Sequence, residues 1–158
     1  MPVPPPQSNK DGLAGLLSAA LAQLQIVQAA DDETDGKSHN LMAAALVLIA
    51  LIGAHMHTEN GFRWLTIVAV ASMLVVVALA IYITREQEYE GAVVNLRQHP
   101  EYFAFDSEFL LAQLIEDATH ASRINTHILK RKQRLLRYSV YMFLVGFVLG
   151  ITALFFNM

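Results

Sequence analysis

Three long apolar stretches dominate the pattern of hydrophobic and polar positions along the chain. They cover residues 41–56, 64–83 and 138–156, and none contains an aspartate, glutamate, lysine or arginine. As helices rising 1.5 Å per residue they reach about 24 to 30 Å, which is close to the thickness of a bilayer's hydrocarbon core. A chain of 158 residues cannot bury three such helices on all sides. The pattern predicts an all-α membrane protein with transmembrane helices at 41–57, 64–84 and 138–157.

The residues before the first apolar stretch fall into three parts. Residues 1–11 are proline-rich, and we expect a disordered tail and not a signal peptide. Leucines at helical spacing in 12–30 predict an amphipathic helix that lies either on lipid or on the protein. The acidic segment 31–40 is expected to be a solvated linker, and binding of a divalent cation by the acidic run 31–35 is the alternative.

Lysines and arginines divide unevenly between the two sides of the predicted membrane. Residues 58–63 form a short turn between the first two spans, so ten of the eleven basic residues share one face and only Arg63 lies opposite. The positive-inside rule makes the basic face cytoplasmic, with the amino terminus inside and the carboxyl terminus outside. Aromatic residues suited to the interfaces lie near the ends of the spans at Trp64, Tyr82, Tyr138 and Tyr141.

Residues 85–137 are the one sizeable water-facing segment, and we expect a cytosolic helical region there. His99-Pro100 interrupts it, and Asp106 and Ser107 can cap a new helix. No proline or glycine follows before Gly146, so the last cytosolic helix is predicted to be continuous with the third span. Packing of these helices predicts a small cytosolic bundle.

Composition argues against several classes of protein. Hydrophobic residues make up 54% of the chain and charged residues 16%, and the net charge of -3 conceals the uneven placement of the basic residues. The absence of cysteine excludes disulfides and thiolate chemistry. Phosphate-cradling glycine loops and serine–histidine–acid arrangements are missing, as is a carboxylate pair within a span. We therefore expect neither an enzyme nor a cofactor, and no nucleic-acid partner.

Two groups of polar residues carry alternative interpretations. His55 and Glu59 are four apart and could hold a metal, although polar residues at a membrane interface are the plainer interpretation. His120, Arg123, His127 and Lys130 follow one stripe of the last helix. That stripe is either an anion site or a solvated helix face.

The end of the cytosolic segment and the third span suggest contacts with lipid and with other helices. The basic cluster 130–137 directly precedes the span, where such clusters set orientation and contact anionic headgroups. Gly146 and Gly150 form a small-xxx-small motif, and Ala50 with Ala54 forms a weaker one in the first span. Both predict close helix packing, either within one chain or between chains.

Several short motifs recur in an order that resembles a known family. They are Asp35-Gly36-Lys37 before the first span, a Leu-x-x-Gln-Leu-Ile stretch at 110–115, and a basic Lys-x-x-Leu-Leu element at 132–136. The chain is similar to the Pycsar effector transmembrane family of bacterial antiphage defence, and more loosely to SLATT membrane effectors. The resemblance covers roughly residues 12–157, and Ser38 stands where the family usually has alanine.

The resemblance implies a function. Such a protein senses a cyclic nucleotide, cyclic CMP or cyclic UMP, made by a partner nucleotide cyclase, and then impairs the inner membrane so that the infected cell stops growing or dies. The matching positions are Asp35, Lys37 and Lys132. We expect an anionic nucleotide to bind through Lys37, Arg97, Arg123 or Lys132, and the protein to act as a homo-oligomer in the bilayer. The alternative is a non-catalytic accessory or structural subunit of a larger membrane complex.

Overall fold

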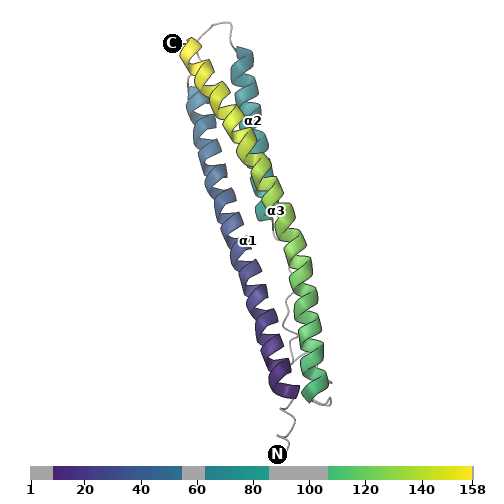
Figure 1. Ribbon diagram of the computed structural model, residues 1–158. Helices are drawn as coiled ribbons and strands as arrows, with labels where there is room; N and C mark the ends of the chain where they lie inside the picture. The colour runs from purple at the N-terminus through teal and green to yellow at the C-terminus, as the bar shows by residue number, and fades with distance from the viewer. Residues whose placement is uncertain (1–8, 55–62, 86–106, 158) are drawn as a thin grey trace, which may run out of the picture. The chain divides into compact units, whose positions relative to one another are not determined.

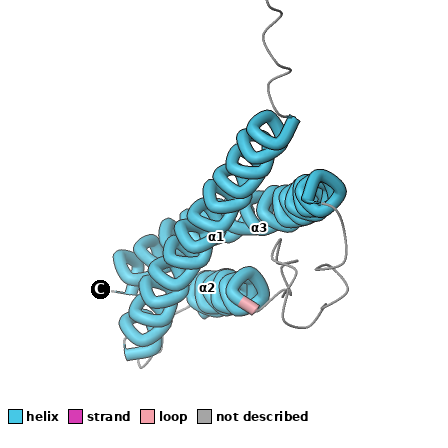
Figure 2. The backbone as a smooth tube through the Cα atoms, turned by 90° about the horizontal axis from the view of Figure 1, so that it is seen from below, coloured by secondary structure: helices cyan, strands magenta, loops and turns pink. Residues whose placement is uncertain are grey.

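The computed structural model describes residues 9–54, 63–85 and 107–157, and it forms them into three helices (Figure 1). They are α1 (Asn9–Ala54), α2 (Arg63–Thr84) and α3 (Ser107–Asn157). The tube view contains no strand in these residues (Figure 2). The predicted all-α fold is confirmed. The predicted turn at 58–63, apart from Arg63 at the start of α2, and the predicted break at His99-Pro100 lie outside the described residues.

The three helices are long because no proline interrupts them. All five prolines lie outside them, so no helix loses a backbone hydrogen bond to a proline ring. α3 begins at Ser107, as the capping signal predicts, and continues for 51 residues through the third apolar stretch. The predicted continuity between the water-facing helix and the third span is therefore confirmed.

The acidic segment 31–40 departs from its predicted form. We expected a linker that separates two helices, and this was wrong for the backbone, because α1 passes through the segment without a break. Lys37 pairs with Glu33 one turn earlier at 2.6 Å, which supports the helix locally and lowers the pKa of Glu33 through a hydrogen bond and a favourable charge. Asp31, Thr34 and Ser38 are buried, so one polar face of the segment is packed.

The described residues belong to two compact units. The first contains 9–31 and 107–129, and its core is a small cluster of Leu24, Ala118 and Ala121 with Ala20 against it. The second contains 32–54, 63–85 and 130–157, and its core is formed by Ala45, Met73 and Val76 with partly buried side chains around them. Alanine at these positions lets helix backbones approach closely.

Buried positions recur along α3 in steps of three, four or seven residues. This spacing is typical of helices that pack along their length, because it keeps one seam facing its neighbours. The seam is small or polar at most positions: Ala118, Ser122, Asn125, Leu129, Lys132, Ser139, Gly146, Gly150 and Ala153. Bulky apolar side chains such as Tyr138, Val145 and Val148 are exposed instead.

All three helices are long and apolar enough to cross a membrane, which is consistent with a multi-pass membrane protein. The candidate spans cover Gly12–Ala54, Trp64–Thr84 and Glu108–Phe155. The first and third, at 43 and 48 residues, extend about 65 and 72 Å, roughly twice a bilayer's hydrocarbon thickness or more. Part of α1 and part of α3 must therefore lie outside the hydrocarbon.

A candidate functional site at a buried charge pair

A charge pair joins α1 to α3 inside the second unit. The Nζ of Lys132 donates hydrogen bonds to both carboxylate oxygens of Asp35, at 3.1 and 3.2 Å. The Lys132 side chain is 3% exposed and that of Asp35 is 29% exposed. A lysine withdrawn this far from water is costly unless a carboxylate neutralises it. The pair therefore holds a specific register between two helices that are 97 residues apart in sequence.

Small hydroxyl side chains continue the buried seams next to the pair. Ser38 is fully buried three residues after Asp35, and its Oγ donates to the carbonyl of Ala80 on α2 at 3.4 Å. Ser139 lies two helical turns after Lys132, is also fully buried, and donates to the Leu135 carbonyl at 3.1 Å. These bonds to backbone carbonyls satisfy the two hydroxyls. Lys132 and Asp35 thus sit among small and polar buried side chains.

Lys37, which the resemblance places in the ligand site, occupies a different environment from Lys132. Its side chain is 62% exposed and pairs with Glu33 on the same helix, not with Asp35. The structure brings together Asp35 and Lys132, two of the three positions that match the family motifs, and leaves Lys37 at the surface.

Arg123 belongs to the first unit, where it lines an open hollow on α3. The other lining residues are Gln113, Glu116, Asp117, Thr119 and His120. Gln113 donates to Asp117 at 3.3 Å, and two carboxylates beside one guanidinium give the hollow mixed charge. Arg97, the remaining predicted ligand residue, lies outside the described residues.

The stripe of His120, Arg123, His127 and Lys130 is exposed along its whole length. Its exposure agrees with a solvated helix face, and binding of an anion there stays a prediction. His55 and Glu59, the candidate metal ligands, lie outside the described residues. Among residues 9–54, 63–85 and 107–157, no three histidine or acidic side chains gather as metal ligands.

The two glycines of the third span pack within the chain. A Cβ at Gly146 would lie 3.0 Å from both Met73 Cε and Ser72 Cβ on α2. A Cβ at Gly150 would lie 2.8 Å from Ile52 Cδ1 on α1. Among the described residues, both glycines therefore face helices of their own chain. Ala50 and Ala54 are exposed, so the weaker motif faces outward.

One cross-helix contact was not anticipated from the sequence. Arg131 Nη2 donates to the hydroxyl of Tyr82 on α2 at 3.0 Å, and the guanidinium carbon lies 5.9 Å from the centre of the Tyr82 ring. The sequence places both residues near a membrane boundary but gives no sign that they meet. The described residues form an all-α fold with three candidate membrane spans, which is consistent with a multi-pass membrane protein. No protein-family model, curated protein or solved structure matches the chain.

Proposed function

We propose that the chain is a membrane effector of bacterial antiphage defence. It binds a cyclic pyrimidine nucleotide, cyclic CMP or cyclic UMP, on its water-facing side and then impairs the inner membrane, so that the infected cell stops growing or dies. A nucleotide cyclase supplies the signal, and several copies of the chain act together. The proposal rests on the family motifs at Asp35, Lys37 and Lys132 and on the physical features described below.

The observation that carries the proposal is the pairing of Asp35 with Lys132 at the start of two spans. A cyclic nucleotide monophosphate carries one negative charge, and that charge can compete with the Asp35 carboxylate for the ammonium of Lys132. Asp35 is the more exposed partner, so an anion reaches the pair from the carboxylate side. Replacing Asp35 by the phosphate removes this polar contact between α1 and α3 while Lys132 stays neutralised.

The continuity of α3 supports transmission of that change. One helix runs from Ser107 to Asn157, so movement of Lys132 is passed directly to the glycine face at Gly146 and Gly150. Packed helix interfaces have discrete arrangements and do not deform continuously, which suits a switch. The ligand favours the open arrangement only as far as it binds that arrangement more tightly.

The packing of the second unit corresponds to the resting state in this scheme. A Cβ at Gly150 would meet Ile52, and a Cβ at Gly146 would meet Ser72 and Met73, so the helices are in close contact at both glycines. A leak therefore requires repacking of the spans, with polar seam residues such as Ser139 turned toward water. Rearrangement between copies supplies new contacts for the separated faces.

Membrane potential and growth in bacteria that produce the protein test the proposal. Cells with co-expressed synthesis of cyclic CMP or cyclic UMP are expected to depolarise and stop growing, while cells with a catalytically dead cyclase grow normally. The variant Asp35→Ala is expected to depolarise cells without nucleotide, and Glu33→Gln, which removes an exposed carboxylate two residues away, is not. Normal potential with both nucleotides, in cells whose membranes contain the protein, contradicts the proposal.

A further inference from the structure

The exposed face of α2 gives a measure of depth in the membrane. Trp64 and Tyr82 are exposed at its two ends, 60% and 41% respectively, and Val68 and Val75 are exposed between them. Tyr82 follows Trp64 by 18 positions, which is about 27 Å along a helix and close to the hydrocarbon thickness of a bilayer. Indole and phenol rings favour the two interfaces of a membrane. Tyr82 therefore marks one of its boundaries.

Along the exposed face of α3, the side chains change from basic to aromatic to aliphatic over a short distance. Arg131 and Arg134 are exposed first, Tyr138 and Tyr141 follow one to two turns later, and exposed valines come next. Cations, then amphipathic rings, then aliphatic side chains match the order of headgroups, interface and hydrocarbon. The hydrogen bond between Arg131 and Tyr82 links the two faces at the boundary between headgroups and hydrocarbon.

Arg131 differs from the other members of the basic cluster in how it is held. Tyr82 fixes its guanidinium through a hydrogen bond of 3.0 Å and through the ring face, and both side chains remain exposed. A guanidinium carries five N–H donors, and Tyr82 accepts from one nitrogen. Among the residues that the structure describes, no carboxylate pairs with Arg131. Lys132 next to it is buried and already neutralised.

We propose that Arg131 and Tyr82 form a binding site for the phosphate of an anionic phospholipid in the leaflet on the basic side of the protein. The remaining guanidinium donors suit two phosphate oxygens at once. The Tyr82 hydroxyl accepts from Arg131 and keeps its own proton to donate to the lipid. The acyl chains lie along the exposed apolar face below Tyr82 and Tyr138. This assignment does not depend on the sensing of a nucleotide.

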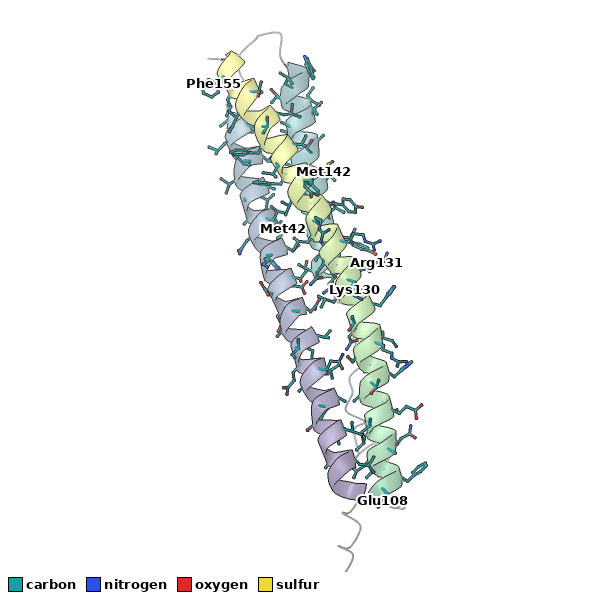
Figure 3. The ribbon with its side chains drawn as sticks, viewed as in Figure 1. Met42, Glu108, Lys130, Arg131, Met142 and Phe155 are labelled. Carbon is teal, nitrogen blue, oxygen red and sulfur yellow. The ribbon has the colours of Figure 1, made fainter. Side chains whose placement is uncertain are left out.

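Lipid binding to the purified full chain in micelles of a neutral detergent tests the site. Native mass spectrometry counts bound dioleoylphosphatidylglycerol against dioleoylphosphatidylcholine as each is titrated. Arg131→Gln removes the guanidinium, and Tyr82→Phe removes only the hydroxyl. The matched control is Lys130→Gln, which removes one exposed charge from the adjacent position on α3 (Figure 3). Far-UV circular dichroism verifies that each variant is folded.

The wild type is expected to retain phosphatidylglycerol in preference to phosphatidylcholine. A charge-assisted pair of hydrogen bonds gives an expected loss of about tenfold in affinity for Arg131→Gln, with a smaller loss for Tyr82→Phe. Lys130→Gln is expected to lose about twofold, as one charge in a diffuse field does. Equal losses for Arg131→Gln and Lys130→Gln would overturn the site in favour of general electrostatic attraction. Displacement of the lipid by cyclic CMP in an Arg131-dependent manner would assign the site to the nucleotide instead.

Discussion

Lys132 on α3 is held by both carboxylate oxygens of Asp35 on α1, whereas Lys37 pairs with Glu33 on its own helix at the shorter distance of 2.6 Å. The shorter pair is the weaker contributor to stability. Lys37 and Glu33 are both more than 60% exposed, and water and salt screen most of their attraction. Lys132 is withdrawn from water, so its pairing with the Asp35 carboxylate offsets part of the cost of burying the charge.

Removal of Asp35 is expected to destabilise the fold more than removal of Lys132. Asp35→Ala deletes the carboxylate that neutralises a buried ammonium, which costs about 3 kcal/mol by analogy with other buried pairs. Lys132→Met deletes the charge and fills the same space with an apolar side chain, while Asp35 stays partly hydrated. Unfolding midpoints of the two variants in mixed detergent micelles give the comparison.

Lys37→Ala is the control for loss of a lysine–carboxylate pair on α1. Its unfolding free energy is expected to stay close to that of the wild type, because the pair is exposed and water and salt screen it. If Lys37→Ala cost as much as Asp35→Ala, burial of Lys132 would not be the source of the difference.

Acid should remove the small contribution of the Glu33–Lys37 pair. Lys37 lowers the pKa of Glu33 from 4.5 in the folded helix, so the pair's contribution is present above the unfolded pKa and is lost as the pH falls through the lowered folded pKa. Stability of the wild type relative to Glu33→Gln, measured by thermal unfolding across acidic pH, should therefore decline as the carboxyl group is protonated and then level off. A constant difference across that range would mean that Glu33 acts by something other than its charge.

The two packed glycines are expected to respond differently to alanine. At Gly146 a methyl group meets Ser72 Cβ at 3.0 Å, an atom fixed to the α2 backbone, so Gly146→Ala should cost about 1 to 3 kcal/mol. At Gly150 the 2.8 Å contact is with the end of the Ile52 side chain, which can change rotamer, so Gly150→Ala should cost less. The midpoint of unfolding in detergent is expected to be lower for Gly146→Ala than for Gly150→Ala.

Gly53→Ala serves as the control for the change of residue type. Nothing lies within 4 Å of a Cβ at Gly53, so the gain in helix propensity should appear alone, as about 0.5 to 1 kcal/mol of stabilisation. Stabilisation by all three alanines would show that the faces at Gly146 and Gly150 are not closely packed.

The three apolar stretches and the long last helix could be predicted from the sequence, because both follow from local patterns. Charge-free runs select the spans, and the lack of proline after Pro100 leaves α3 unbroken. The path of α1 through residues 31–40 could not be predicted by counting acidic residues. In this segment, burial follows the helical position of each residue and not its charge. Asp31, Thr34 and Ser38 are buried at spacings of three and four, whereas Asp32 and Glu33 are exposed.

The role of Lys132 shows what a single sequence leaves out. Lys132 belongs to a basic cluster in which Lys130, Arg131 and Arg134 are all exposed. Residue type alone does not distinguish Lys132 from these neighbours. The seam spacing singles out Lys132, seven residues after Asn125 and seven before Ser139, as the buried member. Its partner is 97 residues away, and no periodicity along one helix identifies a residue on another.

The unbroken α3 makes the coupling between the water-facing side and the span testable at Gln133, an exposed position between Lys132 and the third apolar stretch. Gln133→Pro removes one helical hydrogen bond and forces a kink, at a cost of about 3 kcal/mol in a helix interior. Gln133→Ala keeps the helix intact and is the control. If α3 transmits the signal, cells with Gln133→Pro should keep their membrane potential when cyclic CMP or cyclic UMP is made, while Gln133→Ala cells depolarise.

Two further observations determine how that result is interpreted. Membrane fractions must contain both variants in equal amounts, since a kink that blocks insertion also abolishes depolarisation. Depolarisation without nucleotide in Gln133→Pro cells would mean that the kink separates Lys132 from Asp35, which supports the pair as the resting contact. Nucleotide-dependent depolarisation that survives the proline would contradict coupling through a rigid α3, because a kinked helix passes on less of the motion of its first half.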